Sequence, residues 1–76
     1  SDVKTASSSN VARNGVIGLG GQYYAYADDV VVYEIDGKKL VASAISAVGT
    51  YDTGDISVTF TLNSDGEVNA IYYEIL

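Results

Sequence analysis

The sequence predicts an all-β fold, a small antiparallel barrel of five or six strands of the SH3 or OB kind, with one short helical turn. Three observations support this fold class. Val, Ile, Tyr and Thr are frequent from residue 11 onward, and such side chains favour strands. The chain has no proline that would interrupt strand pairing. Short apolar segments also alternate with turn signals that contain Gly, Asn or Asp.

The 76 residues are enough for one domain. Residues 1–10 are polar and rich in serine, so we interpret them as a linker or a weak edge strand. Residues 11–76 then form the single β-barrel domain. So small a core, with no cysteine available for a disulfide, is only marginally stable alone. We therefore expect packed neighbours, as in a multidomain chain.

The first expected hairpin follows residues 1–10. Residues 11–19 form its first strand, with Ile17 and Leu19 on one face. The pair Gly20-Gly21 is a two-residue turn signal, and residues 22–27 return as the second strand.

A second hairpin is expected in the middle of the chain. The pair Asp28-Asp29 is expected to form a turn before a strand over residues 30–35. Nearly all residues of this strand are apolar, which predicts that both of its faces are covered. The pair Asp36-Gly37 suits a type I′ turn, with positive φ at both central residues, and residues 38–42 form the partner strand.

One helical turn is expected next, with Ser43 as the N-cap and Gly49 at the end. Ala44, Ile45 and Val48 have the spacing of a helix face that packs on a sheet.

The clearest strand of the sequence covers residues 55–62, where apolar and polar side chains alternate. Residues 63–66 form a four-residue turn with a left-handed glycine, and residues 67–75 form the closing strand. The apolar residues of this last strand change face between Ala70 and Ile71. This change predicts a bulge or a strand covered on both sides.

The composition argues against catalysis and against two classes of partner. The chain has no histidine to act as a general base, and no Gly-x-Ser-x-Gly motif marks a nucleophile, so we expect no catalytic residue. The net charge of −6 is opposite to the basic surface of a nucleic-acid-binding protein. No apolar run approaches 18 residues, so we expect no membrane insertion.

Calcium is the only cofactor for which we find candidates. Thr61, Asn63, Asp65 and Gly66 fit part of an EF-hand loop, but Tyr72 stands where that loop needs a bidentate glutamate. A looser site stays open if loops converge. Its weak candidates are Asp28, Asp29, Asp52 and Asp55.

The seven tyrosines suggest an alternative role in ligand binding. Tyrosine rings can bind sugars by stacking, so a tyrosine-bearing face would take a carbohydrate or a peptide. The consecutive pairs at residues 23–24 and 72–73 point to both faces of their strands, which limits any one platform. The candidates for this alternative are Tyr23, Tyr24, Tyr26, Tyr51, Tyr72 and Tyr73.

Three segments carry a resemblance to a known family. They are ADDVVVYEIDGKK at residues 27–39, SAIS at residues 43–46 and TGDISVTFTLNSDGEVNAIYYE at residues 53–74. This series resembles the small β-rich repeat domains of bacterial S-layer and S-layer-homology surface proteins. The helical anchoring motif of that family is not among these residues.

The resemblance implies a non-catalytic structural or spacer module that lies outside the cell, at the cell surface. Its partners would be neighbouring domains of the same chain or lattice.

Overall fold

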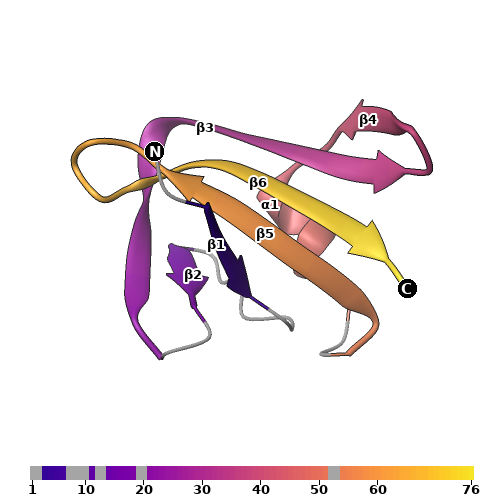
Figure 1. Cartoon of the computed structure of the whole chain (residues 1–76), viewed down its shortest axis with the longest axis horizontal. Helices are drawn as coiled ribbons and strands as arrows, with labels where there is room; N and C mark the ends of the chain where they lie inside the picture. Colours follow the sequence, from indigo (N-terminus) through magenta and orange to yellow (C-terminus); the bar gives the residue numbers. More distant parts are fainter. Residues whose placement is uncertain (1–2, 7–10, 12–13, 19–20, 52–53) are drawn as a thin grey trace.

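The computed structural model describes residues 3–6, 11, 14–18, 21–51 and 54–76. It has six strands and one helix (Figure 1). In chain order they are β1 (Val3–Ala6), β2 (Gly15–Ile17), β3 (Tyr23–Asp36), β4 (Lys39–Ala42), α1 (Ile45–Val48), β5 (Ile56–Leu62) and β6 (Val68–Ile75). The predicted fold class is confirmed, because one sheet curls into a half-barrel around a single short helix.

The sheet has the strand order β1-β5-β6-β3-β2, and β4 pairs with β3 beyond this path. β1 and β2 lie at the two ends of the order and are not paired with each other in the described part of the chain, so the barrel is half closed (Figure 1). α1 lies on the inner face, where Val48 is fully buried. The hydrophobic core therefore fills the concave side of the sheet.

The pairing of β3 with β6 is parallel, with Val32 beside Ile71, whereas all other strand pairs are antiparallel. The sheet is thus mixed rather than wholly antiparallel as predicted. Turn signals predict pairs of strands that follow each other in the chain. The parallel pair instead joins strands separated by β4, α1 and β5, so no local turn indicates it.

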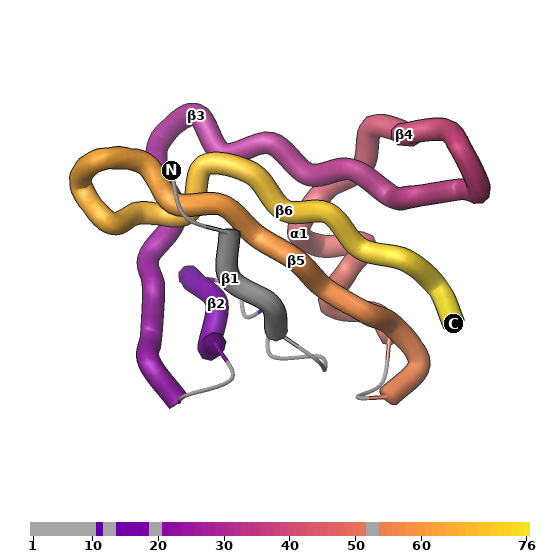
Figure 2. The backbone as a smooth tube through the Cα atoms, in the orientation of Figure 1, coloured from indigo at the N-terminus to yellow at the C-terminus, as the bar shows by residue number. Residues whose placement is uncertain are grey.

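β3 is one long bent strand, and the turn predicted at Asp28-Asp29 is wrong. Tyr26 pairs with Val68 and Val31 with Ala70, so five steps along β3 lie opposite two steps along β6. The extra residues form an irregularity at which the strand changes direction while it stays extended (Figure 2). This bend lets one strand pair with β2 through its first half and with β6 through its second.

The predicted hairpin between β3 and β4 is present, but its turn type differs. Asp36 pairs with Lys39, so Gly37 and Lys38 are the central residues. Gly37 has a φ of +62°, whereas no described non-glycine residue has a positive φ. Positive φ at the first central residue alone is the pattern of a type II′ turn rather than type I′.

The turn between β5 and β6 forms as predicted, with Gly66 at a φ of +78°. The Asn63 side-chain oxygen accepts hydrogen bonds from the backbone N–H groups of Asp65, at 2.9 Å, and Glu67, at 3.0 Å. These bonds satisfy two amides that the tight turn leaves without a ladder partner.

The change of face in β6 predicted either a bulge or a strand covered on both sides, and the structure shows a bulge. Leu62 pairs with Val68 and Thr61 with Ala70, which leaves Asn69 as the extra residue. The Thr61 hydroxyl donates a hydrogen bond to the Asn69 side-chain oxygen at 2.5 Å.

α1 begins one residue later than predicted, and Ser43 is not its N-cap. Ala44 occupies the N-cap position in an extended conformation and makes no side-chain cap. Ser43 precedes the N-cap position, and its hydroxyl shares a 2.7 Å hydrogen bond with the Tyr73 hydroxyl. Gly49 ends the helix as expected.

Core residues come from four strands, the helix and Val11. The alternation predicted for β5 is confirmed, because Ile56, Val58 and Phe60 are buried. The expectation that both faces of residues 30–35 are covered is wrong, since Val31 is 43% exposed. The central cluster is Val11, Val16, Val32, Val48, Ile56, Val58, Phe60, Val68, Ile71 and Tyr73.

At the first predicted hairpin, the strand is shorter than residues 11–19. Val16 is buried and Ile17 is exposed, while Leu19 and Gly20 lie outside the described residues. The turn that leads into β3 is closed by a 3.0 Å bond from the Gly21 N–H to the Gly18 carbonyl.

The two ends of the described chain lie at opposite ends of β5. Of the two interpretations offered for residues 1–10, the structure has an edge strand, β1, in which Val3 pairs with Thr61. At the other end, Ile75 of β6 pairs with Ile56. Ile56 and Thr61 are five positions apart in β5, which is about 17 Å along a strand.

Candidate functional site

The β3–β4 hairpin lies at an edge of the described sheet. All four residues of β4 are exposed, although three of them are apolar. Leu40 is 58% exposed and Val41 is 45% exposed. Consecutive strand residues point to opposite faces, so β4 presents apolar side chains on both of its sides. In Figure 1, no described segment lies beyond the outer edge of β4.

The outer edge of β4 presents backbone hydrogen-bonding groups to solvent. The Ser43 N–H donates to the Val32 carbonyl at 2.9 Å, so Val32 and Ser43 form a hydrogen-bonded pair. In an antiparallel ladder such pairs alternate with non-hydrogen-bonded ones. The pairs of Leu40 with Ile35 and of Ala42 with Tyr33 are therefore non-hydrogen-bonded. The N–H and C=O groups of these two residues point away from β3, toward the free edge.

An apolar stripe runs across the outer, convex face of the sheet from β4 to β6. Val32 and Ile71 point inward, so Val31, Tyr33 and Tyr72, which are next to them in the chain, point outward. The rings of Tyr33 and Tyr72 stack on this face, with centroids 5.8 Å apart and planes 18° apart. We define the outer-face stripe as Val31, Tyr33, Ile35, Leu40, Ala42 and Tyr72.

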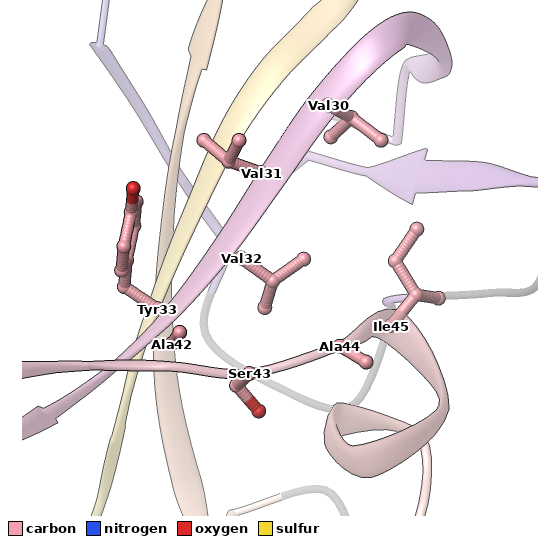
Figure 3. Close-up of a pocket in the computed structure, with 8 residues that line it drawn as sticks. All are labelled: Val30, Val31, Val32, Tyr33, Ala42, Ser43, Ala44 and Ile45. Carbon is pink, nitrogen blue, oxygen red and sulfur yellow. The ribbon is translucent and has the colours of Figure 1, made fainter.

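A shallow hollow of about 370 Å³ lies where the chain leaves β4 (Figure 3). Val30 and Val32 point toward Ile45, whereas Val31 and Tyr33 lie on the opposite side of β3. The lining also includes Ala42, Ser43 and Ala44 and carries no carboxylate or amine side chain. The Ser43 hydroxyl is already bonded to Tyr73. The hollow thus offers apolar contact rather than reactive groups.

The weak calcium candidates do not converge in the described residues. Asp28 and Asp29 are exposed at the bend of β3, and Asp55 is exposed just before β5. Asp52 lies outside the described residues. Within the part of the chain that the structure describes, no three Asp, Glu, His or Cys side chains are placed to share a metal ion.

Four of the six candidate tyrosines belong to the core or pack on it, and Tyr26 is one of them. Tyr73 is only 1% exposed, so it is a core residue and its assignment to a ligand-binding face is wrong. Tyr51 packs on Tyr73, with ring centroids 6.0 Å apart, and Tyr24 packs on Phe60 at 5.6 Å. Tyr73 is buried because side chains alternate along β6, so Tyr73 points inward and Tyr72 points outward.

Tyr23 and Tyr26 join β3 to the segment that contains β2. The Tyr23 hydroxyl donates to the Asn14 carbonyl at 2.8 Å, and the Tyr26 hydroxyl donates to the Gly15 carbonyl at 3.1 Å. Burial raises the pKa of the Tyr26 phenol to about 12, and the negative charge of the neighbouring Tyr23 adds to the shift. Both side chains therefore have a structural role, because they hold β3 against the segment that contains β2.

Only Tyr72 of the six candidates lies in the outer-face stripe, and its stacking partner Tyr33 was missed. The sequence contains a signal for Tyr33, because Val31, Tyr33 and Ile35 recur with the two-residue period of one strand face. That signal was obscured by the continuous apolar run, which suggests burial on both faces.

Two further findings bear on function. Within the described residues, no helix has the length and apolar character that a membrane span requires. No protein-family model, curated protein or solved structure matches the chain.

Proposed function

We propose that this domain is a non-catalytic structural module of a bacterial cell-surface protein, which holds neighbouring domains of its chain or lattice apart. The observation that carries the proposal is the placement of the chain ends. The chain enters β1 beside Thr61 and leaves β6 beside Ile56, at opposite ends of β5. Domains joined at such ends follow one another along the strand direction, so each domain adds length to the chain.

The strand arrangement also suits a module that is pulled through its ends. β1 and β6 both pair with β5 and run antiparallel to it. Tension between the start of β1 and the end of β6 acts along the strands, so the bonds of each ladder are loaded together rather than one after another. The cell-surface setting is supported by the resemblance to S-layer repeat domains, which covers about residues 11–76.

The carbohydrate-binding alternative has weaker support. Sugar rings stack on the open face of an aromatic ring. Tyr33 and Tyr72 instead face each other, and both are half-buried. One face of each ring is therefore taken by the other ring.

The spacing role is tested with chains of one, two and four tandem copies joined by short linkers. Small-angle X-ray scattering measures the maximum dimension of each chain. We expect every added copy to extend the particle by at least about 17 Å, the length of β5 between the two chain ends. A maximum dimension that grows only as the cube root of copy number would mean that the copies pack into a compact particle, and would contradict the spacing role.

The location is tested separately on cells that make the parent protein. Antibodies against this domain should label intact cells as strongly as permeabilised cells. Labelling only after permeabilisation would contradict a place at the cell surface.

A further inference from the structure

We propose that the free edge of β4 pairs with β4 of a second copy of this chain, antiparallel and around a two-fold axis beside Val41. This pairing deepens the structural role proposed above and rests on it for its biological setting. Its physical basis is the geometry of the β3–β4 hairpin alone. An exposed strand edge is a template for pairing with another strand, and a two-fold axis makes one edge serve both partners.

The first argument is the exposure of β4. Leu40 points to the outer face and Val41 to the inner one, and they are 58% and 45% exposed. Neither side chain belongs to the core. A partner strand at the edge would cover apolar surface on both faces of β4 at once. Such burial is favourable in proportion to the apolar area that is removed from water.

The second argument is the backbone register. Leu40 and Ala42 carry the outward N–H and C=O groups, as derived above from the bond between Ser43 and Val32. With the axis beside Val41, Leu40 of each copy lies opposite Ala42 of the other. These two symmetric pairs form four hydrogen bonds and use every outward group of the two residues. The two Val41 side chains then lie directly opposite each other in the closer, non-hydrogen-bonded type of pair.

The third argument is charge. The chain as a whole carries a net charge of −6, which opposes self-association. Residues 33–42, however, contain two acids, Glu34 and Asp36, and two bases, Lys38 and Lys39, so the hairpin is neutral. The net charge therefore lies entirely on the rest of the chain. Two copies that approach through the hairpin therefore meet no local excess of negative charge.

Charge also selects the register. With the axis beside Val41, each Lys39 lies opposite Ser43 of the other copy, at the two ends of the ladder. A register centred on Lys39 would place the two lysines opposite each other, which is destabilising. The chosen register also joins the two outer-face stripes, because Leu40 and Ala42 of both copies lie on the convex face.

The pairing is weak between free domains, because a four-residue strand forms a small interface. We expect a dissociation constant between about 10 µM and 1 mM. Domains held in one chain or lattice have effective concentrations in the millimolar range, which is enough to populate such a contact.

The test measures mass by sedimentation equilibrium from about 10 µM to 1 mM. The unsubstituted chain should rise from 8.0 kDa toward twice that mass. V41K and V41E should each remain monomeric, because like charges would face each other across the axis. An equimolar mixture of V41K and V41E should restore the dimer, since opposite charges then face each other. This rescue is specific to a register with residue 41 on the axis.

The matched control is Ile17→Lys, which changes an exposed apolar strand residue on β2 instead, and it should dimerise like the unsubstituted chain. Amide exchange at high concentration should show protection of the Leu40 and Ala42 N–H groups that is lost in V41K. A mass of 8.0 kDa at every concentration, a dimer that persists in V41K, or no recovery in the mixture would each overturn the proposal. A partner other than a second copy would appear as the first of these results.

The spacing test of the previous section is repeated with V41K in every tandem copy, where β4 pairing is blocked. Extended V41K chains without any dimer would overturn the pairing and leave the spacing role intact. Compact V41K chains, together with a dimer restored in the mixture of V41K and V41E, would overturn the spacing role and leave the pairing intact.

Discussion

The sequence predicts that Ser43 caps a helix, whereas in the structure Ser43 forms a hydrogen bond with Tyr73. Substitutions at these two residues distinguish the two roles. The two oxygens of this bond are 2.7 Å apart, and they join the segment before α1 to the strand β6. We expect Ser43→Ala and Tyr73→Phe to be non-additive, because each substitution removes the same bond. A helix cap would be independent of Tyr73.

The magnitudes follow from burial. Tyr73 is 1% exposed, so Ser43→Ala leaves its hydroxyl without a partner away from water, at a cost of about 1.5 kcal/mol. Tyr73→Phe leaves the half-buried Ser43 hydroxyl, which can reach water, and costs about 1 kcal/mol. The double variant has no orphaned hydroxyl, so its cost should fall below the sum of the two by about 1 kcal/mol.

The assay is urea unfolding of the four chains, supported by thermal melts. For 76 residues the unfolding entropy at the midpoint is about 160 cal/mol/K, so 1.5 kcal/mol lowers the Tm by about 9 °C. If Ser43 were the N-cap, Ser43→Ala would cost about 1 kcal/mol both in the unsubstituted chain and in the chain that carries Tyr73→Phe. Additive costs would therefore refute the bonding role that the structure assigns.

Two further predictions concern β2 and its contacts. A Cβ at Gly15 would lie 2.4 Å from the Tyr24 carbonyl oxygen and 2.6 Å from the Tyr23 ring, so Gly15→Ala should cost about 1–3 kcal/mol in urea unfolding. Gly18→Ala is the control, because its Cβ would lie no closer than 3.4 Å to any neighbour; equal costs would contradict the steric reasoning. The fold favours the protonated Tyr26 phenol, so its stabilising contribution is complete below pH 10 and is lost as the pH rises toward 12. Stability measured across this range should fall less in Tyr26→Phe than in the unsubstituted chain, and an equal fall would show that another group is responsible.

Local patterns predicted those parts of the fold whose causes are local. The alternation of Ile56, Val58 and Phe60 with polar residues requires a strand with one buried face, whatever it pairs with. The turn that ends at Gly66 needs a left-handed residue, and its asparagine satisfies the nearby amides. In both cases the residues that cause the structure lie within a few positions of each other.

The candidate site was only partly predictable, because its residues are far apart in the sequence. Tyr72 was identified as a candidate, but its partner Tyr33 lies 39 positions earlier and reaches it only through the parallel pairing of β3 with β6. Tyr73 was placed with the ligand-binding candidates because the two consecutive tyrosines look alike in the sequence. Which of them faces the core depends on the strand's position in the sheet.

The sequence by itself therefore determined an all-β chain, the strand β5, the hairpin between β3 and β4 and the turn between β5 and β6, because each follows from side-chain periodicity or backbone preference. Tertiary structure alone decided the parallel contact between β3 and β6, the bend at Asp28-Asp29 and the exposure of β4 at the sheet edge. These features depend on which distant strands compete for the two edges of β3. The arrangement that buries the shared core decides which strands pair with β3, and the sequence of a single local segment does not indicate that arrangement.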